Sequence, residues 1–383
     1  MQSSAPPVRG PAVACVVALC VGAMILAGCS GGDGGDGQGG NDETTAADRS
    51  EVVVAAVDDV IVPGYEALAA RTAELVTATE TLCGAPDEQR FTDARDAWSA
   101  AQSAWARTAA YRFGPIKDLR LLARIAYAVD TDKIARFAAE SSEPLTADEL
   151  HGKGADLRGL NAVQYLLFTP TTVAELSPRA CSYAAAAATL SAAAADETRA
   201  AWVDGVDGEP PAAVQMKEPG GDGMWSDTSE ALEDLLNGVL GALTTVVDMQ
   251  LGPVIGVDGE APDPQGADSG AAHRLSQDMT DEIAGIMEIA TGDAADGGLA
   301  ALVAAAGAPR TAESMLSTLA EATGAIFKAG SPISDLDPAV DDAAMGELTR
   351  AHELLGDLRT TMSTEVASLL GLTVSFSDAD GDG

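Results

Sequence analysis

The sequence predicts an all-α protein made of two antiparallel helical bundles, and three observations support this prediction. Of the 383 residues, 46% are hydrophobic but only 4% are aromatic, and alanine is abundant, which suits close-packed helices better than sheets. Apolar residues recur at spacings of three, four and seven over long segments, and no segment alternates as a half-buried strand does. Long helices joined by short breaks, with two long loops in the middle of the chain, are typical of two antiparallel bundles.

The first two predicted helices end at breaks that contain glycine and proline. One begins near Glu51, has Pro63 at a kink or in its first turn, and ends at the 83–86 break. The second spans about 87–113 and ends at the Gly-Pro pair that follows it.

Further helices are predicted over 117–139, 155–168 and 178–203. Ser177 is the expected N-cap of the last of these, because Pro178 suits the first helical position.

Two loops rich in glycine, aspartate and proline are predicted over 203–225 and 251–271. The helix between them, 227–249, begins with Asp227 and Glu230 in capping-box spacing.

The last predicted helix has the clearest apolar stripe. Asp337 is its expected cap, Pro338 its first residue and Gly371 its stop. The stripe, which indicates a side facing the core, consists of Met345, Leu348, Leu355, Leu358, Met362, Val366 and Leu369.

These elements divide the chain into five expected parts. They are a lipoprotein signal peptide (1–28), a flexible Gly/Asp-rich tether (29–48), a first helical bundle (49–204), a loop (205–226) and a second helical bundle (227–383). The tether is expected to behave as a random coil, because it has too few apolar side chains to form a core.

The amino terminus has the form of a bacterial lipoprotein signal. Arg9 precedes an uncharged run that closes on Leu-Ala-Gly before Cys29, which gives the small residues a signal peptidase needs and the thiol that takes a diacylglycerol. An uncleaved membrane anchor is the alternative, since the run is just long enough to span a bilayer. The position of Cys29 and the tether after it favour the lipoprotein, so we expect an extracytoplasmic protein of the cell envelope, lipid-anchored at Cys29.

The charge balance excludes some partners. The chain has 59 acidic and 22 basic side chains, which gives a formal net charge of −37. Binding to nucleic acid needs clustered lysine and arginine, and so does attachment to anionic lipid by charge alone. We therefore expect no nucleic-acid partner.

The cysteines agree with an oxidising compartment. Cys15 and Cys20 are lost with the signal peptide and Cys29 is lipidated, which leaves Cys83 and Cys181. Two cysteines in such a compartment are most simply a disulfide, with two buried free thiols as the alternative.

Common catalytic and metal-binding motifs are missing from the sequence. It contains no H-E-x-x-H, G-x-S-x-G, Walker A or C-x-x-C pattern. Its three histidines, His151, His273 and His352, lie near predicted helix ends or on polar faces, where solvated histidines are typical. A histidine-rich zinc site cannot be assembled here from one local cluster.

The segment 157–168 (LRGLNAVQYLLF) resembles a motif helix of the imelysin family, also called peptidase M75, of bacterial envelope lipoproteins. Four more segments are similar to that family: 98–116, with its W-x6-W spacing and R-F-G-P turn, 118–130, 235–256, and the closing segment 370–382. The resemblance covers roughly residues 52–383.

This resemblance implies two helical bundle domains with a cleft between them, a proposed metallopeptidase activity, and a link of many relatives to iron uptake. The family motif is G-x-H-x-x-E, whose His and Glu share one helix face and can hold a cation. This chain keeps Gly159 but has Asn161 and Gln164 at the other two positions. Neutral amides are weak ligands and cannot act as a general base, so they line a polar cleft or fix helix packing.

Other charged residues in the matching segments are candidates for the same cleft, with surface salt bridges as the alternative. These are Arg112, Asp118, Arg120, Arg124 and Asp130. Weak candidates for metal ligands, with iron or calcium as the ion, are Asn161, Gln164, Asp378, Asp380 and Asp382. The three terminal aspartates mimic the start of a calcium loop but lack its bidentate glutamate.

We therefore expect a lipid-anchored, imelysin-like envelope protein that binds a ligand or assists uptake without catalysis, in iron or haem acquisition. A metal-dependent peptidase acting in the cleft is the first alternative, and a structural envelope protein with a vestigial cleft is the second. The expected partners are the membrane, through the lipid at Cys29, and envelope uptake proteins.

Overall fold

The computed structural model describes residues 49–292 and 297–375, and every regular element within these ranges is a helix. The predicted all-α class is confirmed. The predicted signal peptide, the lipid-bearing Cys29 and the tether lie outside the described residues, as do Asp378, Asp380 and Asp382.

The elements are labelled α for α-helices and η for 3₁₀ or π turns. The amino-terminal elements are η1 (Ala56–Ile61), α2 (Val62–Gly84), α3 (Glu88–Arg107), η2 (Thr108–Tyr111), α4 (Pro115–Asp118), α5 (Leu122–Ile125), α6 (Thr131–Ala139), α7 (Ala147–His151), η3 (Ala155–Leu157), α8 (Leu160–Phe168), η4 (Val173–Glu175) and α9 (Pro178–Val203). The carboxyl-terminal elements are α10 (Ala212–Lys217), α11 (Thr228–Thr244), η5 (Thr245–Leu251), α12 (Gly252–Ile255), α13 (Pro264–Ala267), α14 (Leu275–Thr291), α15 (Leu299–Ala305), α16 (Pro309–Ala329), η6 (Ile333–Asp335), α17 (Asp342–Thr361), η7 (Met362–Val366) and α18 (Ala367–Leu370).

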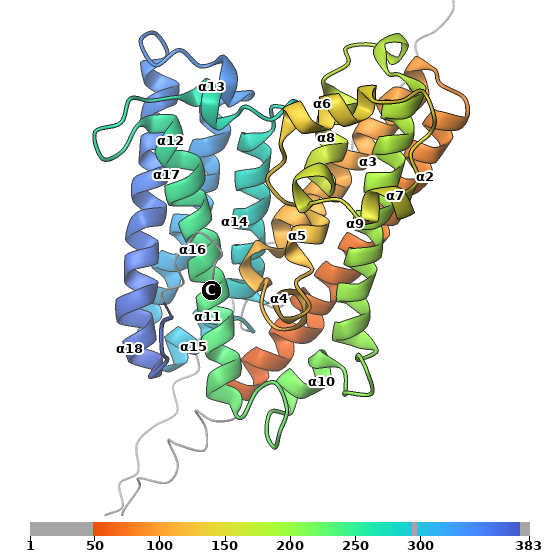
Figure 1. The fold of residues 1–383 in the computed structure, drawn as a ribbon. Coiled ribbons are helices and arrows are strands. Elements are labelled where there is room, and N and C mark those ends of the chain that lie inside the picture. The colour runs from red at the N-terminus through yellow and green to blue at the C-terminus, as the bar shows by residue number, and fades with distance from the viewer. Residues whose placement is uncertain (1–48, 293–296, 376–383) are drawn as a thin grey trace, which may run out of the picture.

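The helices form two groups that lie side by side (Figure 1). In one group α2 packs against α3 and α9, and α8 packs against α3 and α9. In the other, α16 packs against α14, α15 and α17. The groups meet where α14 contacts α3 and where both α11 and α14 contact η2.

Where capping signals were clear, the helices begin where the sequence predicts. The Ser177 hydroxyl accepts a hydrogen bond from a backbone N–H in the first turn of α9, whose bounds match the prediction. Asp227 caps α11 in the same way, and Gly371 ends α18 with a left-handed φ of 63°.

The predicted helix over 117–139 is wrong, because the chain is broken there into α4, α5 and α6. Arg120 has a φ of 53°, which no helix accommodates, and the Asp130 carboxylate caps a new helix by accepting from the Lys133 N–H. The helix predicted over 155–168 starts only at Leu160, after a 3₁₀ turn.

The last helix begins later than predicted. Asp337 and Pro338 lie in a turn, because the Asp337 carboxylate accepts from the Ala339 N–H while Asp341 accepts from the Asp337 N–H. Helix α17 therefore starts at Asp342. The predicted loops contain the short helices α10, α12 and α13, and the sequence analysis did not assign α14, α15 and α16.

A long apolar helix crosses the middle of the second group. Elements α11, η5 and α12 run continuously over Thr228–Ile255, the one described helix long and apolar enough to cross a membrane. Half of its most apolar window is buried inside the protein, as in a core helix. This long helix has a π-helical turn at η5, over Thr245–Leu251. Such turns often occur at functional sites.

A short segment at the end of α3 lies between the two groups. We call residues 107–111 the central segment. An ideal Cβ on Gly238 of α11 would overlap the carbonyl oxygen of Ala110, and one on Gly285 of α14 would overlap that of Arg107. The backbones of α11 and α14 therefore approach the central segment as closely as they do only because both positions are glycine.

A buried aromatic group anchors the same segment to the first helices. The Tyr65 hydroxyl donates to the Tyr111 carbonyl oxygen (2.7 Å), and the two rings meet edge to face with centroids 5.4 Å apart. The Tyr111 ring reaches over Gly64, where any Cβ would clash with its hydroxyl. Trp202 from α9 stacks on Tyr65 at 5.9 Å.

The predicted disulfide is present between Cys83 and Cys181, with their Cα atoms 5.6 Å apart. It joins the last turn of α2 to the first turn of α9. Replacing both cysteines with serine should lower the free energy of unfolding by about 4–5 kcal/mol, because the bond spans 98 positions and restricts the unfolded chain. Denaturant unfolding of the variant and of the reduced protein checks this, and a loss below about 1 kcal/mol in both would contradict it.

The glycine contacts give a matched pair of substitutions on one helix. Gly238→Ala should destabilise the protein by about 1–3 kcal/mol, because the added methyl meets the central segment. Gly241→Ala, one turn further along α11, has open space at its Cβ and should be neutral or slightly stabilising. Equal free energies of unfolding for the two variants would show that the close approach is not required.

Candidate functional site

The motif helix α8 is fixed at its start by glycine and tryptophan. Gly159 has a φ of 87°, and a Cβ there would lie 3.0 Å from the Ile125 carbonyl oxygen. A side chain is therefore disfavoured by both conformation and space. The indole N–H of Trp98 donates to the Leu160 carbonyl oxygen (2.8 Å), which ties α8 to α3.

The two amides at the motif positions lie on the side of α8 that faces neighbouring segments. The Asn161 side chain donates to the Tyr127 carbonyl oxygen (2.8 Å). The Gln164 amide lies against Gly270, just before α14, with both of its polar atoms 3.1 Å from the position of a Cβ there. Gln164 therefore sits where the first group of helices meets the second.

The donors around α8 do not fit the metal that the family motif implies. Among the residues that the structure describes, no three His, Cys, Asp or Glu side chains lie close enough to hold one ion. Asn161 uses its amide nitrogen on a backbone carbonyl, and an amide oxygen alone is a weak ligand for a hard cation. These positions therefore hold polar, uncharged groups at the junction.

The other predicted site residues are dispersed. Arg124 forms an ion pair with Glu197 (2.7 Å), and Asp130 forms one with Lys133 (3.3 Å). Asp118, the last residue of α4, and Arg120, in the turn after it, are both exposed. Arg112 is partly buried, and its guanidinium covers the Trp105 ring at 3.7 Å.

Beyond Trp98, a band of polar side chains runs along the contact between the two groups. We call it the polar seam, and its members are Gln102, Arg107, Arg112, Gln250, Arg274, Asp278, Asp281 and Glu282. The Arg274 guanidinium lies 5.7 Å from the Trp98 ring centroid, so the seam begins beside the residue that holds α8.

Most carboxylates of the seam are paired. Arg274 donates to Asp278 (2.7 Å) and to Ser103 of α3 (2.8 Å), and its guanidinium is 3.4 Å from Asp281. Gln102 of α3 donates to the second carboxylate oxygen of Asp278 (3.2 Å). Because these bonds are partly buried, they fix α14 against α3 with directional contacts.

Glu282 is the exception. Only 7% of its surface is exposed, and its Oε1 accepts from the Gln250 amide (3.1 Å) while its Oε2 has no hydrogen-bond partner. Burial raises the pKa of Glu282 to about 7, although the nearby Arg112 opposes this shift. Burial also lowers the pKa of Arg112, which donates to the Trp105 carbonyl oxygen (2.6 Å).

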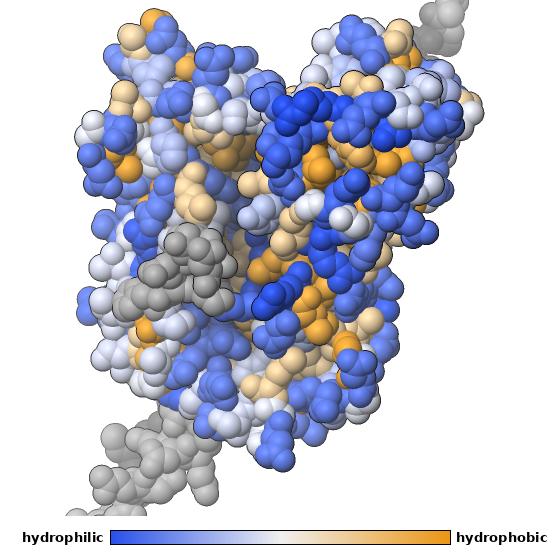
Figure 2. Space-filling model, in the orientation of Figure 1, coloured by the Kyte–Doolittle hydropathy of each residue, from blue (hydrophilic) through white to orange (hydrophobic). Residues whose placement is uncertain are grey.

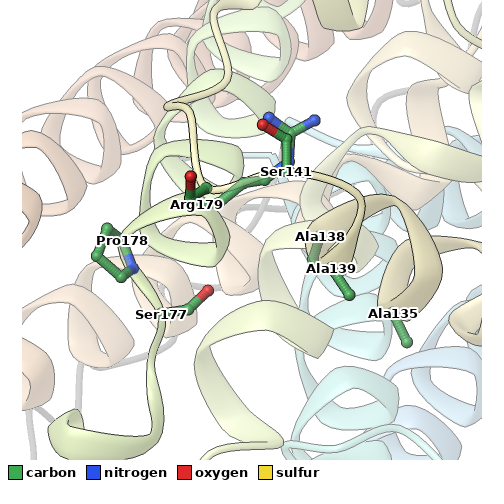
Figure 3. A pocket seen from close by; sticks show the side chains of 8 residues that line it. Ala135, Ala138, Ala139, Ser141, Ser177, Pro178 and Arg179 are labelled. Atoms are coloured by element: carbon green, nitrogen blue, oxygen red, sulfur yellow. The ribbon is translucent and has the colours of Figure 1, made fainter.

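The surface is hollowed between the two groups of helices (Figure 2). A separate depression of 440 Å³ lies between α6 and the start of α9 (Figure 3). Its polar lining includes Arg179, but that guanidinium already donates to the Phe137 and Glu143 carbonyl oxygens. The junction at α8 and the polar seam is thus the better candidate for a functional site.

Sequence reasoning found Asn161, Gln164 and Arg112 but missed the acidic residues of the seam. The available signal was the placement of Asp278 and Glu282 one turn apart in a helix that also carries a set of buried apolar side chains. Their partners Gln102 and Gln250 lie on different helices, so no local pattern links them.

Comparisons with known proteins agree with this fold. The family model Peptidase_M75, described as Imelysin, matches residues 61–362. "Iron-regulated protein A" from Synechococcus elongatus is 24% identical over 255 residues, which are 67% of this chain and 68% of that protein.

Two solved structures share the fold. An imelysin-like protein from Psychrobacter arcticum 273-4 has a TM-score of 0.71 and 17% identity, over 86% of this chain and 98% of that one. An iron-regulated protein A precursor from Parabacteroides distasonis has a TM-score of 0.66 and 19% identity, over 83% and 95% of the two chains.

The state of Glu282 predicts a pH-dependent stability. A folded-state pKa of about 7, against an ordinary 4.5, means that the folded protein binds the proton more tightly than the unfolded chain does. The contribution of Glu282 to the free energy of unfolding is therefore greatest below pH 4.5. It falls by on the order of 3 kcal/mol as the pH rises through 7.

Glu282→Gln keeps the side chain neutral at every pH. The variant should gain stability relative to the wild type between about pH 5 and pH 8, as measured by denaturant unfolding. The exposed Glu353→Gln on α17 is the control and should show no such change. A difference between Glu282→Gln and the wild type that stays constant with pH would contradict the prediction.

Proposed function

Because the chain belongs to the imelysin family, whose model it matches over residues 61–362, we propose that it is an accessory lipoprotein of the cell envelope. In this proposal it binds a ligand at the junction of α8 and the polar seam, serves iron or haem acquisition, and does not hydrolyse peptides. The family membership is the starting point, and the chemistry of the junction decides between binding and catalysis.

The observation that carries the proposal is the pair of amides at the motif positions. Asn161 and Gln164 stand where the family motif has His and Glu, and neither can accept a proton at neutral pH. Both can donate and accept hydrogen bonds, which suits recognition of a polar ligand. Arg274, beside Trp98, adds further hydrogen-bond donors close to the start of α8.

The names of the relatives support the link to iron. Both "Iron-regulated protein A" from Synechococcus elongatus and the precursor structure from Parabacteroides distasonis are named for regulation by iron. We carry over that association, and no activity, to this chain.

An envelope location is supported by two features of the chain. The Leu-Ala-Gly-Cys sequence that ends at Cys29 provides an acylation site. The disulfide between Cys83 and Cys181 is stable in an oxidising compartment. We propose that acyl chains on Cys29 hold the helical fold at a membrane through the tether.

The test uses the full chain, purified from bacterial membranes in detergent and dialysed against ferric citrate or haemin. The wild type should retain one of the two. Asn161→Ala with Gln164→Ala should weaken retention about tenfold, because each amide contributes roughly one hydrogen bond. Bound iron is measured by mass spectrometry and haemin by absorbance.

Gln89→Ala is the control, because Gln89 is an exposed amide of α3 that donates to the neighbouring Asp93. It should leave retention unchanged. Peptide cleavage by the wild type that a chelator blocks and Asn161→Ala abolishes would establish the peptidase instead. Retention of neither probe would refute the iron or haem role, and a Cys29→Ser variant that stays in the membrane fraction would refute the lipid anchor.

A further inference from the structure

Helix α14 carries two carboxyl groups one turn apart, each bound by a glutamine of another element, and the two carboxyl groups differ in one respect. Asp278 accepts from Gln102 through one oxygen (3.2 Å) and from Arg274 through the other (2.7 Å). Glu282 accepts from Gln250 through Oε1 (3.1 Å), but its Oε2 is buried and receives no hydrogen bond. The first carboxylate is fully paired, and the second is not.

The Gln250 side chain has the complementary defect. Its amide nitrogen donates to Glu282, while its carbonyl oxygen Oε1 is buried without a donor. Gln102 Oε1 is also buried without a donor, but both oxygens of its partner Asp278 already accept hydrogen bonds, so only the Glu282 pair has an unsatisfied oxygen on each side chain. Two acceptor oxygens that belong to one contacting pair are thus both unsatisfied. A buried acceptor without a donor is unfavourable, because the atom has lost its hydrogen bond to water and gained none in return.

One proton would satisfy both atoms. We propose that Glu282 and Gln250 form a proton-operated latch, in which the protonated Glu282 Oε2–H donates to Gln250 Oε1 while the Gln250 amide donates to Glu282 Oε1. The pair then makes two parallel hydrogen bonds, as a carboxylic acid and a primary amide can. When the proton leaves to solvent, one hydrogen bond remains beside a buried negative charge.

The charges around Glu282 place this change near neutral pH. Burial raises its pKa to about 7, and Asp278 and Asp281 of the same helix act in the same direction. Arg112, which follows η2, acts in the opposite direction, and the Gln250 amide of η5 does too.

The latch joins α14, which contacts the central segment, to η5, which packs against α11, α14 and α17. Glu282 belongs to α14, which packs on α3 and η2, and Gln250 belongs to the π turn η5 of the long apolar helix. That turn is also held from α17, because Arg359 forms an ion pair with Asp248 (2.5 Å). Loss of the proton therefore loosens the contact of α14 with η5 while the α17 contact stays.

Infrared spectroscopy of the full chain tests the latch directly. A protonated carboxylic acid has a C=O stretch distinct from a carboxylate, and a titration from about pH 5.5 to 8.5 should show it disappear near neutral pH. The band should be missing in Glu282→Gln. It should move to higher frequency in Gln250→Leu, because the C=O then loses its donor.

Hydrogen exchange supplies the second measurement. Amides of α14 and η5 should exchange at least about fivefold faster above the transition than below it, after correction for the intrinsic rate, because one net hydrogen bond is lost. Glu282→Gln should abolish this difference. Glu288→Gln, on the same helix but paired with Arg107 (2.5 Å), should retain it.

Several outcomes would overturn the proposal. One is a wild-type spectrum without any carboxylic acid band that Glu282→Gln removes. That result would mean that water, and not a proton on Glu282, satisfies the two oxygens. Another is a band whose frequency is unchanged in Gln250→Leu. Should Gln250→Leu fail to fold, the wild type and Glu282→Gln still decide the matter, since equal hydrogen-exchange profiles at both ends of the titration would refute the latch. The proposal does not depend on the iron or haem role.

Discussion

The close backbone approach of α11 and α14 to the central segment is the constraint on which the rest of the structure depends. Gly238 and Gly285 leave no atom between these helices and the carbonyl oxygens of Ala110 and Arg107. The central segment begins at the end of α3, so it connects the first group of helices to α11 and α14 of the second. This contact fixes where α14 lies, and so it fixes where the seam of polar residues on α14 meets α3 and η5.

The position of the seam explains why a chain with altered motif residues keeps a structured junction. Trp98 ties α8 to α3 by one hydrogen bond and lies beside Arg274, which bonds Asp278 and Ser103. Polar contacts therefore run from the motif helix to α14 without a metal ligand among them. In this arrangement Asn161 and Gln164 contribute shape and hydrogen bonds. Glu282 is the carboxyl group whose pKa lies near neutral pH.

Sequence reasoning succeeded where a structural signal is local. Ser177 and Pro178 define the start of α9, and Gly371 defines the end of the last helix, because caps act within one turn. It failed over 117–139, where apolar spacing continues although the Asp130 N–H bonds the Asp156 carbonyl oxygen and the helix restarts. The Glu282 site was equally beyond prediction, since its partner comes from a π turn on another helix.

Native-state hydrogen exchange of the central segment tests the account most directly. If the segment holds both groups of helices in place, then at about pH 5.5, where Glu282 is protonated, the amides of 108–111, α11 and α14 should exchange only through global unfolding, with one common free energy. Exchange of α14 or α11 through a separate, lower-energy opening that leaves 108–111 protected would contradict the account. It would mean that the two groups are independent units with a minor contact between them.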